Sequence, residues 1–187
     1  MISLRTLRSL IADHGELEVD LLTEAGTFQA RKLHLVEQLS KPTRCELTIT
    51  SADDVDLEAL LERPATVVLR FGMTELRRWS LVLGRVDFTG MHGGMLHFRL
   101  ELHPAFWLLG FTKDVRKWRD EPTEPIVEGI LDRYGVVHRW ETTRPTNARP
   151  YCVQYRESCL DFVSRLLEYE GIYYAFEEDG TMVLADQ

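Results

Sequence analysis

The stretch Gln154–Phe176, QYRESCLDFVSRLLEYEGIYYAF, decides how the fold is interpreted. Ser158 is a favourable helix N-cap, and Asp161 follows it at the spacing of a capping box. Apolar residues then recur at helical spacing, and Gly171 stands where a helix would end in the left-handed conformation. From Ile172 onward, alternate residues are apolar or aromatic, as in a strand. The stretch predicts a short capped helix over residues 158–170, a glycine stop and a strand that turns back.

The neighbouring sequence predicts one more helix and a C-terminal hairpin. Pro125 suits the first turn of a helix, apolar residues follow at helical spacing, and Gly135 ends the pattern, which predicts a helix over residues 125–134. Residues 136–141 are expected to form a strand. Asp179 and Gly180 predict a tight turn before a returning strand over residues 181–185.

The first half of the chain predicts short antiparallel strands. They are separated by a polar link, Ser40–Thr43, whose Pro42 is unsuited to a central ladder, and by a glycine-rich turn over Thr89–Gly94. A short helical turn is expected within residues 51–63, and the N-terminal leucines from Leu4 could form one face of a helix. Leu17, Val19 and Leu21 alternate as in a strand, and the further expected strands cover residues 28–36, 44–50, 65–71, 75–88 and 95–102.

These elements predict an α+β fold that is mostly β. Short strands at this spacing, joined by turns that contain glycine and proline, favour an antiparallel barrel or sandwich for the first part of the chain. We expect a β-barrel-like domain over residues 1–110 and an α+β domain over residues 111–187, which contains both predicted helices and the hairpin.

Composition argues against several classes of protein. A net charge of -8 and a pI near 5.3 are unlike a general nucleic-acid binder, which carries a basic face. The three cysteines, Cys45, Cys152 and Cys159, suit neither a disulfide framework nor a zinc site and are expected to be reduced. No secretory signal and no stretch long enough to span a membrane are visible. We therefore expect neither nucleic acid nor membrane as a partner.

No pattern predicts a catalytic, cofactor-binding or metal site. The six histidines form none of the short pairs that favour a metal ion, and Gly90–Gly94 lacks the features of a phosphate-binding loop. Ser158 lacks the surroundings of a nucleophilic serine. Arg156 and Arg165 are expected to pair with nearby acids. Those acids favour a solvated helix face over a pair for acid–base catalysis: Glu157, Asp161, Glu168 and Glu170.

Aromatic side chains crowd the second half of the sequence, from Phe106 to Tyr174. An aromatic-rich core explains this pattern, and so does a surface between subunits, where Tyr, Trp and Arg are enriched. The sequence leaves both explanations open.

The opening stretch resembles the signature of VgrG proteins, the spike proteins at the tip of the type VI secretion tube. Other segments agree in order: Glu37–Ser40, Leu100–Leu109, Pro125–Val127 and Val183–Asp186. Cys159 departs from the family, which usually has a small acidic or polar residue there, and Trp118 stands near a common phenylalanine. The resemblance extends from about residue 28 to the end. Its central motif consists of Gln154, Tyr155, Arg156, Glu157, Ser158, Asp161, Phe162, Arg165, Leu166, Leu167, Glu170, Gly171, Ile172, Tyr173, Tyr174 and Phe176.

The resemblance implies a structural, non-enzymatic role. VgrG proteins look like fused hub and spike proteins of contractile phage tails. Three copies form a ring that adapts the spike to the Hcp tube and baseplate, and effectors attach through regions outside this part. The resemblance thus implies a homotrimer in the full-length protein, assembled in the cytoplasm and then secreted without a signal peptide. It covers only the first part of the hub, before a second barrel. A phage or prophage tail hub, or late control protein, is the alternative, and an enzyme is a weaker one.

Overall fold

A computed structural model describes residues 16–52 and 55–187. The helix considered at the N-terminal leucines lies outside these residues. Internal contacts divide these described residues into two compact units: unit 1 holds residues 16–34, 46–52 and 55–101, and unit 2 holds residues 35–45 and 102–187. The domain boundary expected near residue 110 stays a prediction.

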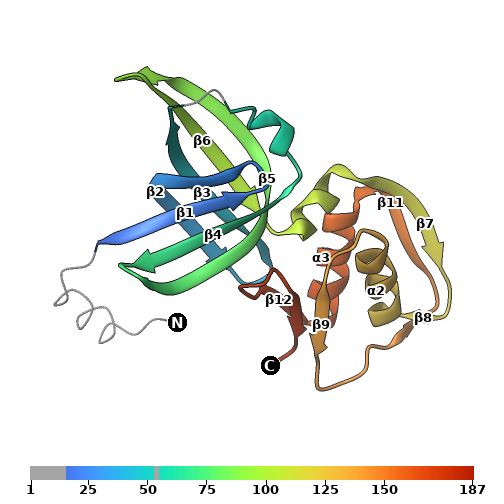
Figure 1. Ribbon diagram of the computed structural model, residues 1–187. Helices are drawn as coiled ribbons and strands as arrows, with labels where there is room; N and C mark the ends of the chain where they lie inside the picture. Colours follow the sequence, from blue (N-terminus) through green and yellow to red (C-terminus); the bar gives the residue numbers. More distant parts are fainter. Residues whose placement is uncertain (1–15, 53–54) are drawn as a thin grey trace. The chain divides into compact units, whose positions relative to one another are not determined.

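Unit 1 is built on a six-stranded sheet that closes on itself in the order β1-β2-β3-β6-β5-β4 (Figure 1). This closed sheet confirms a mostly β, barrel-like fold. Leu47 and Ile49 alternate along one face of their strand and are fully buried, which is worth about 1.5–3 kcal/mol for each side chain. The strands are β1 (Leu17–Thr23), β2 (Gly26–Gln38), β3 (Lys41–Ser51), β4 (Pro64–Phe71), β5 (Thr74–His92) and β6 (Met95–His103).

Strand β1 closes the sheet, because Val19 lies opposite Ala30 of β2 on one side and Leu69 of β4 on the other. The helical turn expected within residues 51–63 is confirmed as a short 3-10 helix, η1 (Glu58–Leu60). The turn end of the β2–β3 hairpin, residues 35–45, belongs to unit 2 together with the last residues of β6.

Two details of the strand prediction were wrong. Pro42 lies within β3, near the start of that strand, where a proline is tolerated, and Ser40 takes the turn with a φ of 58°. The glycine-rich turn is shorter than expected, since β5 continues to His92 and only Gly93 and Gly94 join it to β6. Their φ values of 58° and 77° are those of the tight hairpin turn that matches the twist of paired strands.

Unit 2 packs two α-helices against small sheets (Figure 1). Strand β13 pairs antiparallel with β12 and parallel with β9, while β7 pairs with β11 and β8 with β10. The elements are η2 (Ala105–Phe111), β7 (Lys113–Trp118), β8 (Glu121–Pro122), α2 (Thr123–Arg133), β9 (His138–Glu141), β10 (Ala148–Arg149), β11 (Cys152–Ser158), α3 (Cys159–Glu170), β12 (Tyr173–Phe176) and β13 (Met182–Ala185).

Both predicted helices are present. Helix α2 begins two residues before the expected start, because Pro125 still falls in the first turn, where no intrahelical N–H bond is lost. The strand β7 was not expected from the sequence, and neither was its partner β11, which leads directly into the predicted N-cap of α3.

The core of unit 2 is aromatic at its centre. Phe106 and Tyr174 are fully buried, with ring centroids 5.3 Å apart in an edge-on arrangement. Phe162 of α3 is also fully buried and stacks on Trp118 of β7 at 5.2 Å. The explanation of the aromatic residues as core is therefore confirmed for these side chains. This explanation does not apply to Tyr155, whose ring is exposed.

Candidate functional site

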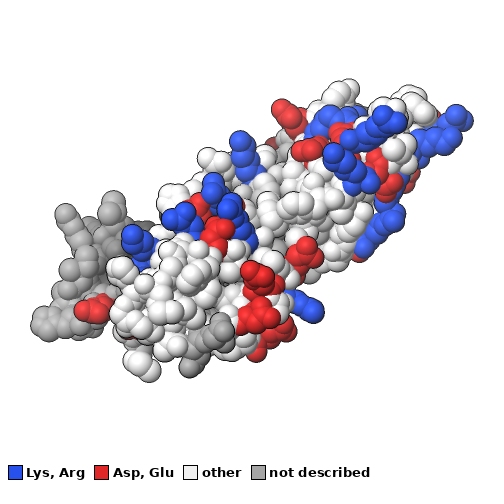
Figure 2. All heavy atoms as spheres, turned by 90° about the horizontal axis from the view of Figure 1, so that it is seen from above, with Lys and Arg blue, Asp and Glu red and all other residues white. Residues whose placement is uncertain are grey.

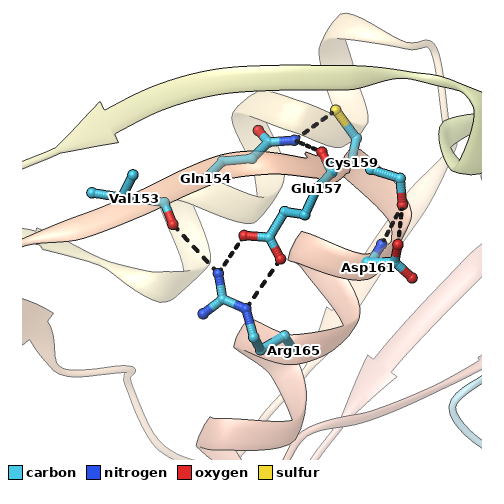
Figure 3. Close-up of polar contacts among 7 residues, drawn as sticks. Val153, Gln154, Glu157, Cys159, Asp161 and Arg165 are labelled. Carbon is cyan, nitrogen blue, oxygen red and sulfur yellow. Dashed lines mark hydrogen bonds and ion pairs between the residues drawn. The ribbon is translucent and has the colours of Figure 1, made fainter.

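The start of α3 is held by reciprocal hydrogen bonds between Ser158 and Asp161. The Asp161 N–H donates to Ser158 Oγ at 3.0 Å, and the Ser158 hydroxyl donates to Asp161 Oδ2 at 2.7 Å (Figure 3). Ser158 is buried, so water has little access to replace it as the cap. At the other end Gly171 adopts a left-handed φ of 70°. The predicted cap and the predicted stop are both confirmed.

An ion pair ties β11 to α3. Arg165 donates from Nη2 to Glu157 Oε1 at 2.6 Å and from Nε to Oε2 at 3.2 Å, and its Nη2 also reaches the Val153 carbonyl at 3.4 Å (Figure 3). These bonds raise the pKa of the Arg165 guanidinium. The expected pairing of Arg165 with a nearby acid is confirmed. Its Arg side chain is half exposed, so the pair orients the strand more than it stabilises it.

Gln154 of the same strand is fully buried. Its amide nitrogen donates to the Glu157 carbonyl at 3.3 Å and to Cys159 Sγ at 3.4 Å (Figure 3). Its Oε1 has no partner among the residues that the structure describes. Burial raises the pKa of the neighbouring thiol of Cys152, which disfavours the reactive thiolate. All three cysteines are free and buried.

Among the residues that the structure describes, Arg156 has no acidic partner, contrary to expectation. The register of β11 against β7 shifts between Tyr155 and Glu157, and Arg156 occupies this bulge with a φ of 53°. The extra residue turns Arg156 to solvent together with Tyr155, and the guanidinium carbon lies 5.4 Å from the Tyr155 ring. Glu157 is then free to face α3.

A polar cluster at the C-terminal end of α3 was missed by sequence reasoning. Arg149 of β10 donates to Glu170 Oε1 at 2.9 Å and to the Thr123 hydroxyl at 2.8 Å, and Thr123 donates to the same Glu170 oxygen at 2.7 Å. The side chains of Arg149 and Glu170 are 18% and 14% exposed. Glu170 thus lies off the solvated face expected for it. Residues distant in sequence meet here, and no local motif signals the contact.

A further arginine, Arg144, binds the C-terminal end of α3. Arg144 Nη2 donates to the Glu170 carbonyl at 2.8 Å, and its Nε lies 3.7 Å from Asp186. Asp186 also accepts from the Thr143 N–H at 2.9 Å, and this bond is the main reason that the pKa of the Asp186 carboxyl lies below its ordinary value. These contacts hold the loop before β10 and the last strand together.

Other residues of the predicted signature make contacts around α3 within unit 2. Tyr173 donates its hydroxyl to the Gln187 carbonyl, and the Tyr174 carbonyl accepts from the Ser40 N–H at 2.8 Å. Tyr174 also has its pKa raised by burial. The other members are in the unit 2 core or border it: Phe162, Leu166, Leu167, Ile172 and Phe176.

The described residues around α3 form caps, ion pairs and packing contacts. No group of three or more His, Cys, Asp and Glu in the described part of the chain could hold a metal ion. A hollow of about 470 Å³ lies in unit 2 between the β2–β3 turn and the end of α3, lined by Ser40, Gly171 and Tyr173 among others. None of the described helices is long and apolar enough to cross a membrane.

The chain is similar to proteins of phage tails and of type VI secretion spikes. The family model for the phage tail baseplate hub (GPD) matches residues 36–187. The type VI secretion system spike protein VgrG1b of Pseudomonas aeruginosa is 30% identical over 91% of this chain and 24% of its own length. VgrG1a of the same organism is 32% identical over 91% of this chain and 27% of its own length. The chain therefore spans about a quarter of the length of these curated relatives.

Solved structures show the same fold. The E. coli c3393 protein, a component of the type VI secretion system described as similar to T4 tail proteins gp27 and gp5, superposes with a TM-score of 0.72 at 25% identity, over 92% of this chain and 47% of that one. A 43 kDa prophage MuSo2 tail protein from Shewanella oneidensis shares the fold alone, with a TM-score of 0.65 at 9% identity over 90% and 53% of the two chains. The chain belongs to the phage tail baseplate hub (GPD) family and is homologous to the VgrG spike proteins of type VI secretion systems.

Proposed function

We propose that this chain is a non-catalytic structural part of the trimeric base of a type VI secretion spike. The homology to VgrG proteins supports a structural role in the spike. The observation that carries the proposal for this chain is that the polar residues of its signature bind one another or other residues of unit 2. Glu157, Ser158, Asp161, Arg165 and Glu170 are all occupied by caps and ion pairs within unit 2.

A spike base transmits force and needs no turnover, so stiffness is the property that its residues must supply. The Ser158 cap holds the first turn of α3, and the Arg149–Glu170 cluster ties the last residue of the helix to β10. The Glu157–Arg165 pair orients β11 against the middle of the helix. Such ties resist shearing of the helix along its sheet. In this role the base adapts the spike to an Hcp-like tube and to baseplate proteins, and effectors attach through regions outside this chain.

The proposal also covers where the protein assembles and how it leaves the cell. The protein assembles in the cytoplasm and leaves the cell with the spike, without a cleaved signal peptide. The experiment is an in-frame deletion of the coding region of this chain in its host, followed by measurement of Hcp in the culture medium. We expect Hcp export to be lost and to be restored by the wild-type gene. Normal export in the deletion strain would contradict the proposal.

A matched pair of variants separates a structural role from a catalytic one. Glu168→Gln removes an exposed carboxylate of α3 and is expected to restore export fully. Phe162→Ala removes a fully buried ring and is expected to fail or to restore it weakly. Loss of export with Glu168→Gln, together with a hydrolase activity that it abolishes, would favour an enzyme.

A phage or prophage tail hub is the second candidate, favoured by the tail-protein fold shared with the Shewanella prophage protein. The two candidates differ in the tube that they contact. Purified chain is therefore tested for co-sedimentation with tubes of Hcp and with tubes of the tail-tube protein from any prophage in the same genome. Binding to the phage tube alone would replace the secretion proposal.

A further inference from the structure

One face of the β7–β11 ribbon is exposed and carries an apolar centre. Side chains alternate along β7, so that Lys113, Val115 and Lys117 are exposed and their neighbours are half-buried. Tyr155 of β11 lies directly opposite Val115 in the strand register. Their side chains are 63% and 62% exposed. A cross-strand pair of this kind is worth little to the sheet when water covers it, so the face is available to a partner.

The same face is basic. The bulge turns Arg156 outward beside Tyr155, and Lys113 and Lys117 flank Val115. Within the described part of the chain, neither these lysines nor Arg156 has an acidic partner; Arg156 contacts the Tyr155 ring alone. Figure 2 shows Lys and Arg side chains at the end of unit 2 that carries β7, with Asp and Glu side chains among them. The whole chain, in contrast, has a net charge of -8.

The edges of the ribbon are blocked, so a partner is expected to meet its face. The Val115 N–H on the β7 edge donates to Asp114 Oδ1 at 2.8 Å. The Val153 carbonyl on the β11 edge accepts from Arg165 at 3.4 Å. Addition of a strand at either edge would have to displace the contact on that edge.

Unit 1 carries a surface of the opposite character. A hollow of about 510 Å³ is lined by Leu57, Val86 and Phe88 among other apolar side chains, with Asp56 and Glu58 beside them. The Phe88 ring is 59% exposed and lies 5.6 Å from that of Phe98. Glu58 is exposed and has no partner among the described residues, whereas Asp56 accepts from the Ala59 N–H.

We propose that the β7–β11 face of one copy of this chain docks into the hollow of unit 1 of a second copy. Tyr155 and Val115 cover the apolar lining, and Arg156 faces Glu58. Two β7–β11 faces cannot meet each other, because that contact would bring like charges together. The contact is therefore head-to-tail, and such contacts produce rings when the rotation closes. The inference rests on the proposed trimer and names the surfaces that form it.

Cysteine cross-linking tests this pairing of surfaces. Tyr155→Cys and Glu58→Cys are placed on separate copies, mixed and treated with a short bis-maleimide; the native cysteines are buried and contribute little background. We expect a cross-linked dimer in the mixture and in neither variant alone. The control replaces Tyr155→Cys by Val137→Cys, which is equally exposed but lies outside the face. Equal cross-linking with the control, or none with the pair, overturns the inference.

Charge reversal provides a second measurement on the full chain. Arg156→Glu and Glu58→Arg are each expected to weaken self-association on the order of tenfold in sedimentation velocity at low salt, and the double variant is expected to recover most of the loss. Circular dichroism verifies that each variant is folded. If all three variants form the trimer as readily as wild type, this interface is overturned and the hub proposal still stands. A chain that stays monomeric at every concentration also overturns this interface, whereas the trimer proposed for the full-length protein rests on the homology.

Discussion

Replacement of Ser158 by alanine tests the element on which the interpretation of unit 2 depends. The substitution removes the oxygen that accepts the Asp161 N–H at 3.0 Å and the hydroxyl that donates to Asp161 Oδ2. The N–H is left in a region where Ser158 itself is only 5% exposed. The N-terminus of α3 therefore loses its cap with little access to water as a substitute.

The expected cost follows from this burial. Loss of an N-cap costs about 0.5–2 kcal/mol, and the buried site places Ser158→Ala in the upper half, at about 1.5 kcal/mol. For a chain of this size, 1 kcal/mol corresponds to about 2–4 °C in Tm, so we expect a decrease of about 3–6 °C. Ser158→Thr keeps the accepting oxygen and is expected to lose less than half as much.

The assay is urea unfolding followed by tryptophan fluorescence. Trp107, Trp118 and Trp140 lie in unit 2, so its unfolding dominates the signal over that of Trp79 in unit 1. Ser164→Ala is the matched control, since it makes the same change inside α3, where Ser164 Oγ is 3.5 Å from the Tyr174 hydroxyl.

We expect the control to change the free energy of unfolding by less than about 0.5 kcal/mol, because alanine has the higher helix propensity. Equal losses for both serine variants would refute the capping argument. So would an unchanged midpoint for Ser158→Ala with an unchanged slope.

Three further predictions concern the other end of α3 and the last strand. Gly171→Ala forces a left-handed φ of 70° on a residue with a Cβ and should cost about 1–2 kcal/mol in thermal unfolding. Glu170→Ala leaves Arg149 largely buried without its carboxylate and should cost about 3 kcal/mol in the same urea assay, clearly more than Glu168→Gln on the exposed face of α3. The lowered pKa of Asp186 contributes stability at pH values above about 4 that is lost as the pH falls through its folded pKa, so the stability advantage of wild type over Asp186→Asn should shrink from pH 6 to pH 3.

The sequence by itself determined the elements whose physics is local. Ser158, its partner three residues later and Gly171 act within one helix, so spacing and residue type are enough to predict the cap and the stop. The helix after Pro125 and the turn at Gly180 follow from the same kind of rule. The family resemblance also depends on a contiguous motif, which is why it could be stated before any contact was known.

Only the tertiary structure decided the features that join distant residues. Arg149 and Glu170 meet across 21 positions of sequence, and the bulge at Arg156 depends on its register against β7, which no local pattern reveals. The register decides which side chains remain in water, since one extra residue reverses the alternation of a strand. That reversal turned Arg156 from an expected ion-pair partner into part of an exposed basic face, while Glu157 was left to bind Arg165 and hold α3.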